Sequence, residues 1–164
     1  MNNKPIFLYK HFSGSQLNNN KYNLSNFVNI IYNNFVYLAK YPQLKHNTNE
    51  ILRLLTSNKS YIITVMYNNL MVAYCITEIM KLQDGRNILF INYLYTGSKY
   101  RRYGIASQII KKMILYAKYK HLDAVILVCD TDDTRVMDFY FKKGFMYDMV
   151  MRRYDKYDVI TLNL

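Results

Sequence analysis

Apolar and polar positions in the first third of the chain predict a strand followed by two helices. Residues 5–11 form a short apolar run, and the polar residues 13–21 after it have the composition of a loop. From residue 25 apolar side chains recur at helical spacing, and Tyr41-Pro42 ends that pattern. A second, shorter helix is expected from Asn47, whose side chain can cap it, through Leu55.

The middle of the chain changes from helical spacing to runs of β-branched and aromatic residues. These runs cover residues 61–67, 71–80 and 88–95. Two turn signals, Asn68-Asn69 and Asp84-Gly85, separate them. We therefore expect three antiparallel strands that follow one another in the sheet.

The C-terminal part returns to alternating helices and strands. The pattern predicts a helix over residues 104–120, an apolar strand over 124–129, a helix over 133–143, and two final strands around Asp155-Lys156. The predicted order is β-α-α-β-β-β-α-β-α-β-β. Such an order indicates an α/β fold with a mixed sheet covered by helices.

Length and cysteine content limit the class of protein. With 164 residues, the chain has the size of one domain spanning 1–164. No apolar run approaches the ~20 residues needed to cross a bilayer, so we expect a cytoplasmic protein with no membrane partner. Cys75 and Cys129 lie far apart in apolar surroundings, which predicts neither a disulfide nor a metal site.

The chain is strongly basic, with a formal net charge of +11. Residues 1–82 hold 8 Lys and Arg against 2 acids, and residues 83–164 hold 14 against 9, so the charge is not confined to a tail. Such a surface favours anionic ligands, nucleic acid or acidic proteins, without choosing among them. The abundance of Asn, Lys, Ile and Tyr is also what A+T-rich codons supply, so the positive charge is weaker evidence for such partners.

Residues 95–107 leave a predicted strand and enter a predicted helix through a basic, glycine-containing loop. A helix start offers free backbone N–H groups, and Gly104 and Ala106 lack the bulk that would keep a phosphate away. Lys99, Arg101 and Arg102 add positive charge. The loop has neither the Gly-Lys-Ser/Thr of a Walker loop nor the first glycine of a dinucleotide fingerprint. An ordinary strand-to-helix turn with solvated arginines is the alternative.

Two segments resemble the motifs of the GCN5-related N-acetyltransferases, the GNAT family. Residues 101–106 are similar to its acetyl-CoA signature, Arg/Gln-x-x-Gly-x-Gly/Ala. Residues 133–145 resemble Asn-x-x-Ala-x-x-Phe-Tyr-x-x-x-Gly-Phe, with Asp133 in place of the usual Asn and Val136 in place of Ala. The predicted element order also agrees with the family, which implies a mostly antiparallel central sheet with helices on both faces.

The resemblance implies acetyl-CoA as the cofactor and an amine, on a small molecule or a protein, as the acceptor. The pantetheine arm would bind backbone groups of Leu94 and Thr96 where two neighbouring strands part, a region that can also stabilise an oxyanion. Tyr140 would protonate the departing thiolate. Whether the protein forms a homodimer stays an open question. The implied cofactor-binding residues are Leu94, Tyr95, Thr96, Arg101, Arg102, Tyr103, Gly104, Ile105, Ala106, Ser107, Asp133, Tyr140 and Lys142.

No residue is assigned as the base for the attacking amine. Some family members carry a Glu within the strand, but residues 90–93 contain no carboxylate. Glu78 and Asp130 are the remaining acids, and direct deprotonation by water is equally compatible. Cys129 has no histidine placed by motif to activate it, so we expect a core residue rather than a nucleophile.

The leading hypothesis is an N-acetyltransferase in which the amine attacks directly in a ternary complex. One alternative is a catalytically inactive module that binds CoA. The other is a basic nucleic-acid-binding protein, which is disfavoured because the carrier motif already accounts for the densest basic cluster. A protein amine, a polyamine and a small amine all stay open as acceptors, although the net charge opposes polycations.

Overall fold

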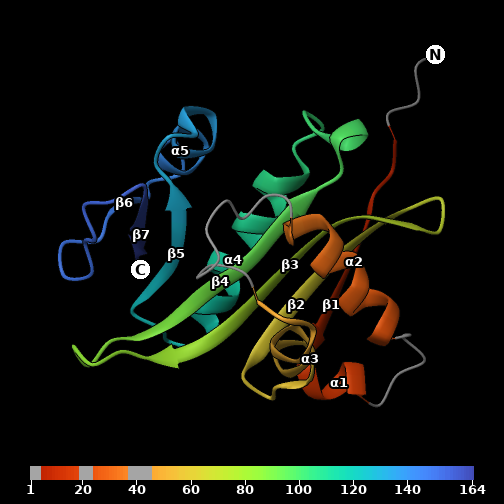
Figure 1. Ribbon diagram of the computed structural model, residues 1–164, viewed down its shortest axis with the longest axis horizontal. Helices are drawn as coiled ribbons and strands as arrows, with labels where there is room; N and C mark the ends of the chain where they lie inside the picture. Colours follow the sequence, from red (N-terminus) through yellow and green to blue (C-terminus); the bar gives the residue numbers. More distant parts are fainter. Residues whose placement is uncertain (1–4, 19–23, 37–45) are drawn as a thin grey trace.

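The computed structural model describes residues 5–18, 24–36 and 46–164, and its elements follow the predicted order with one added helix, α1, and a 3-10 turn (Figure 1). The strands are β1 (Leu8–Ser13), β2 (Ser60–Tyr67), β3 (Leu70–Lys81), β4 (Asn87–Thr96), β5 (Ala124–Asp130), β6 (Met146–Tyr147) and β7 (Tyr157–Asn163). The helices are α1 (Gly14–Asn18), α2 (Leu24–Val36), α3 (Thr48–Thr56), α4 (Ile105–Tyr119) and α5 (Thr134–Phe141). A 3-10 turn, η2 (Ser98–Tyr100), precedes α4.

The described strands form one mixed sheet in the order β1-β2-β3-β4-β5-β7-β6. The first four strands pair antiparallel, as predicted for residues 61–95. β4 and β5 run parallel and pair only over Ile88–Phe90 and Ala124–Ile126. Beyond these three pairs the two strands splay apart (Figure 1).

Helices cover both faces of the sheet, as expected. On one face α1, α2 and α3 bury residues such as Leu17, Ile31 and Leu55 against β2, β3 and β4. On the other face α4 and α5 contribute Ile109 and Tyr140 to the largest apolar cluster. The alternation of side chains along β2 explains this division, since neighbouring residues of a strand point to opposite faces. α3 begins with the expected cap, because the Asn47 side chain accepts a hydrogen bond from the Glu50 N–H at 2.9 Å.

The predicted loop over residues 13–21 is wrong in part, because Gly14–Asn18 form α1. Only one apolar side chain of this helix, Leu17, is fully buried, and a single position has no periodicity to detect. Gly14 packs closely against the backbone of Ser57, just after α3. A Cβ added to Gly14 would lie 2.0 Å from the Ser57 carbonyl oxygen. The predicted helix end at Tyr41-Pro42 falls outside the described residues.

The C-terminal hairpin also differs from the prediction of two strands around Asp155-Lys156. β6 lies at Met146–Tyr147, and residues 148–156 form a longer connection to β7. The Asp148 carboxylate ends β6 by accepting hydrogen bonds from the Val150 and Met151 N–H groups. None of the described helices is long and apolar enough to span a membrane.

Candidate functional site

A cleft of about 460 Å³ opens where β4 and β5 part. Its floor comes from β4, including Asn92 and Leu94, and from β5, including Cys129. Asp133 and Tyr140 of the α5 region line one side, and Phe35 and His46 line the other. The expected wedge between two neighbouring strands is therefore present, and it is hollow.

A β-bulge in β4 shapes the floor of this cleft. Ile76 of β3 faces Tyr93, whereas the next residue, Thr77, faces Ile91, so Asn92 is the extra residue on β4. The Asn92 Nδ2 atom is buried and has no hydrogen-bond partner among the described residues. A buried amide without a partner costs free energy, so a ligand with a hydrogen-bond acceptor would be stabilised here.

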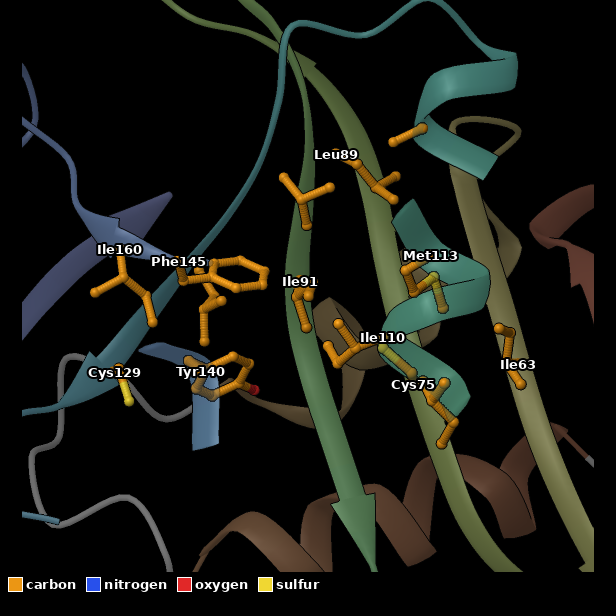
Figure 2. Close-up of a cluster of buried hydrophobic side chains, with 14 of the residues drawn as sticks. Ile63, Cys75, Leu89, Ile91, Ile110, Met113, Cys129, Tyr140, Phe145 and Ile160 are labelled. Carbon is orange, nitrogen blue, oxygen red and sulfur yellow. The ribbon is translucent and has the colours of Figure 1, made fainter. Parts of the chain in front are cut away.

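Tyr140 combines a structural position with access to the cleft. Its side chain is 5% exposed and packs edge-on against Phe145, with ring centroids 5.3 Å apart. Figure 2 shows the hydroxyl directed toward β4, which carries Ile91, while the ring lies beside Cys129 and Phe145. Burial raises the pKa of Tyr140 well above its ordinary value of ~10, and the nearby Cys75 and Cys129 thiols raise it further. The hydroxyl therefore keeps its proton at any physiological pH.

A second hollow, of about 340 Å³, lies over the start of α4. It joins the end of β4, at Thr96, to the first turn of the helix, and Gly104 caps that helix with φ +78°. A Cβ added to Gly104 would meet nothing within 4 Å, so the space above the helix start is open. The Thr96 hydroxyl oxygen is buried and unpartnered in the described part of the chain. The described lining consists of Thr96, Tyr100, Arg101, Arg102, Gly104, Ile105, Ala106, Ser107 and Phe139.

This hollow is suited to an anion. Backbone N–H groups at the beginning of a helix are free to donate, and the helix dipole adds positive potential. Arg101 and Arg102 border the space, and the Arg101 Nε donates to the Thr96 carbonyl oxygen at 3.2 Å. Arg102 holds the left-handed φ of +69°, which is uncommon for a residue with a side chain.

Three of the residues expected to hold the carrier line neither hollow. Tyr95 lies on the face of the sheet that α1, α2 and α3 cover, where it stacks on Tyr74 at 5.4 Å between ring centroids. Tyr103 is 57% exposed and packs edge-on against Phe7. Lys142 is exposed and follows α5 as its C-cap residue. The remaining expected residues divide between the two hollows.

Asp133 borders the cleft and also caps α5. Its Oδ1 accepts a hydrogen bond from the Val136 N–H at 3.2 Å, so one carboxylate oxygen is used to start the helix. An Asn at this position could make the same hydrogen bond, which explains how Asp replaces the amide of the motif without loss of the helix start.

The two acids left as candidate bases are not equivalent. Glu78 forms a two-pronged ion pair with Arg53, at 2.9 and 3.3 Å, and so has a structural partner. Asp130 lines the cleft and accepts the Asp132 N–H. Burial raises the pKa of Cys129 to about 12, and the neighbouring Asp130 and Asp133 raise it too, so Cys129 stays a thiol.

Sequence patterns missed a histidine in the cleft. The His46 Nδ1 is hydrogen-bonded to the hydroxyl of Tyr93, a residue 47 positions later in the chain, and both line the cleft. Burial raises the pKa of Tyr93, and Glu50 raises it further. A neutral imidazole nitrogen can act as a proton acceptor. The helical cap at Asn47, immediately after His46, was the only local signal near this position.

Comparisons with known proteins agree with the two motifs. The sequence model of the Acetyltransferase (GNAT) family matches residues 27–145. No match was found among curated proteins.

Solved structures share the fold at low sequence identity. One is the NatC complex bound to Gag peptide and CoA, with 19% identity, a TM-score of 0.70, and coverage of 96% of this chain and 97% of that chain. Another is NAA60 of Arabidopsis thaliana in complex with a bisubstrate analogue, with 8% identity, a TM-score of 0.71, and coverage of 96% and 98%. A GNAT family acetyltransferase from Elizabethkingia anophelis with acetyl-CoA bound has 19% identity, a TM-score of 0.58, and coverage of 72% and 84%.

Proposed function

The chain belongs to the GNAT acetyltransferase family, and from this premise we propose that it is an acetyl-CoA-dependent N-acetyltransferase. The observation that carries the proposal is the continuity of the site along β4. Leu94 lines the cleft and Thr96 lines the hollow over α4, so one strand connects a space for chemistry with a space for phosphates.

The residues present fit acetyl-CoA, which supplies an acetyl group activated as a thioester. The amides at the start of α4, from Arg102 to Ser107, would hold the pyrophosphate. Two buried polar atoms without partners among the described residues, Asn92 Nδ2 and Thr96 Oγ1, lie where an acceptor and a donor of the carrier arm could satisfy them. Among the described strands, none pairs with the side of β4 that faces β5 beyond Phe90, which leaves backbone groups for the pantetheine amides.

In the proposed reaction the amine nitrogen attacks the acetyl carbonyl directly, and the carbon–sulfur bond breaks without an acyl-enzyme. Tyr140 holds a proton at the cleft wall and donates it to the departing sulfur. The thiol form of Cys129 supports direct attack, because the thiolate is the nucleophilic form of cysteine.

The amine must lose a proton, and the cleft offers His46 as its acceptor. His46 lines the wall opposite α5 and is oriented by its hydrogen bond to Tyr93. Asp130 and Asp133 lie on the side of Tyr140, and Asp133 is engaged at the start of α5. Water in the cleft is the alternative acceptor.

The test uses the purified full chain. Calorimetry should detect acetyl-CoA binding that weakens as salt rises, because surface cations and phosphates attract each other. CoA release should then be measured with a panel of peptides, polyamines and small amines. Binding of acetyl-CoA with no release of CoA above hydrolysis, for every amine of the panel, would favour the inactive CoA-binding module instead.

A further inference from the structure

A smaller chamber adjoins the side of the cleft that Phe35 and His46 line. It has a volume of about 200 Å³ and lies between α2 and α3, over Tyr93 of β4. The chamber and the cleft share three wall residues, Phe35, His46 and Tyr93, so the two spaces meet at the His46–Tyr93 pair. A molecule whose amine lies in the cleft can therefore extend a side group into the chamber.

The walls of this chamber are apolar and aromatic. Phe35 packs edge-on against Tyr93 at 4.8 Å between ring centroids, and Ile51, which is 1% exposed, contributes an aliphatic surface. Tyr32 and Val36 of α2 complete the apolar part. At about 30 Å³ per water-sized group, the space holds on the order of six non-hydrogen atoms. That is the size of a leucine or phenylalanine side chain.

None of the described residues that line the chamber is acidic, although Glu50 lies near enough to raise the pKa of Tyr93 in its wall. The nearest carboxylate in α3, that of Glu50, accepts the Asn47 N–H at 2.7 Å in the capping box, and the Asn47 side chain accepts the Glu50 N–H. An ammonium group placed against these apolar and aromatic walls would lose its hydration, and no described lining residue offers it a carboxylate.

We infer that the acceptor is a primary amine next to one large apolar side group, and that this side group binds in the chamber between α2 and α3. This inference rests on the proposed function, and it selects among the amine classes that the sequence left open. The same chemistry occurs in a peptide N-terminus with an apolar first side chain and in a free branched or aromatic amine. Polyamines and aminoglycosides, which carry several ammonium groups, match these apolar walls poorly.

The first experiment compares acceptors on the unmodified chain. The acceptors are three tetrapeptide amides that differ only in a first residue of leucine, serine or lysine, together with isoamylamine and spermidine. The kcat/KM for the leucine peptide should exceed that of the serine and lysine peptides by at least about 30-fold, since each methylene in an apolar pocket contributes roughly 10-fold or more. A preference for isoamylamine over every peptide would identify a free amine as the source, and the reverse would identify a peptide N-terminus.

The second experiment fills the chamber. Val36→Phe should lower the leucine-to-serine preference at least tenfold while acetyl-CoA affinity stays within threefold, because Val36 lines only the chamber. Asn29→Phe places the same side chain on the exposed face of the same helix and should change neither quantity. If Val36→Phe lowers the melting temperature strongly, Val36→Leu gives a smaller obstruction with the same expected direction.

The outcomes separate this inference from the proposed function. Acetylation of spermidine or of the lysine peptide at least as efficiently as the leucine peptide would overturn the inference alone. A folded Val36→Phe protein with an unchanged preference would do the same. No turnover with any acceptor, although acetyl-CoA binds, would overturn the proposed function and the inference with it.

Discussion

At the scale of single residues, Tyr140 belongs both to the apolar core and to the wall of the cleft. Its ring packs against Phe139 and Phe145, with centroids at 5.1 and 5.3 Å, while the residue lines the cleft and its hydroxyl is directed toward β4 (Figure 2). Removal of the hydroxyl alone therefore separates the two functions, because the ring contacts persist in phenylalanine.

Tyr140→Phe should reduce kcat by roughly 10²-fold and leave acetyl-CoA affinity nearly unchanged, since only a proton donor is lost. The defect should shrink as pH falls, because solvent then protonates the thiolate more readily. Steady-state kinetics between pH 6 and pH 9 measure both effects. Tyr119→Phe, at a residue that is 75% exposed, serves as the control. Full activity of Tyr140→Phe across this range would remove Tyr140 from the mechanism.

Residues of the site differed in how far the sequence could reveal them. Tyr140 and Gly104 occupy fixed positions in the two contiguous motifs, so the resemblance to the family was sufficient to expect them in the site, and both line the hollows described above. His46 and Asn92 could not be found this way. His46 depends on a hydrogen bond to a residue 47 positions away, and Asn92 depends on a bulge set by the pairing of β3 with β4. Neither interaction leaves a periodic trace in one chain.

At the scale of the secondary-structure elements, the start of α4 depends on the backbone of Gly104. Its φ of +78° is strained for any residue with a Cβ, although the space around it is open. A side chain there would therefore act in two ways, by straining the turn and by occupying the space above the helix start.

Gly104→Val should weaken acetyl-CoA binding more than tenfold, measured by calorimetry. Gly85→Val is a matched control, because Gly85 has φ +95°, has equally open surroundings, and lies in the turn between β3 and β4. Both variants should lose about 1–2 kcal/mol of unfolding free energy, but only the first should lose affinity. An affinity within threefold of the parent for Gly104→Val would mean that this loop does not bind the phosphates.

Elements with strong periodicity were predicted correctly, whereas α1 and β6, which have five and two residues, were not. The helix over residues 104–120 and the strands over 61–95 each place several apolar residues on one face. α1 has one fully buried apolar side chain, and β6 has two residues, so pairing and packing with distant segments determine them. The aspartates that shape the connection between β6 and β7 act through side-chain hydrogen bonds, which apolar periodicity does not report.

At the scale of the whole molecule, two buried aspartates hold the C-terminal connection to the sheet. Asp148 pairs with Arg86 of the turn between β3 and β4 at 2.7 Å, and Asp158 pairs with Arg152 at 2.8 Å. Burial alone would raise the pKa of Asp148, but hydrogen bonds from Arg86 and from the Met151 and Val150 N–H groups outweigh it and leave this pKa below its ordinary value. The same balance, with backbone donors at Arg153 and Val159, lowers the pKa of Asp158.

The lowered pKa values predict a loss of stability in acid. A carboxylate with a folded-state pKa below its unfolded value of ~3.9 stabilises the fold above that value, and its contribution disappears as pH falls through the folded-state pKa. Asp148→Asn should therefore lower the free energy of unfolding by about 2–3 kcal/mol at pH 7. The difference from the parent should shrink below about pH 4.

Urea unfolding at pH 7 and at pH 3 measures this difference. Asp132→Asn is the control, since its ion pair with Lys156 is exposed on both sides and should contribute at most about 1 kcal/mol at either pH. An Asp148→Asn protein equally destabilised at both pH values would show that the carboxylate acts through packing rather than through its charge.

The strand order has a consequence for how the molecule is assembled during synthesis. β1 to β4 are neighbours in the sheet in the same order as in the chain, and only the C-terminal pair departs from it, with β7 between β5 and β6. A chain that leaves the ribosome from its N-terminus can thus add each of the first four strands to the one just completed. The wedge needs β5 and α5, which come after residue 123. The cleft therefore cannot form before these C-terminal elements are made, and a chain that ends before β5 would keep the start of α4 but lack the cleft.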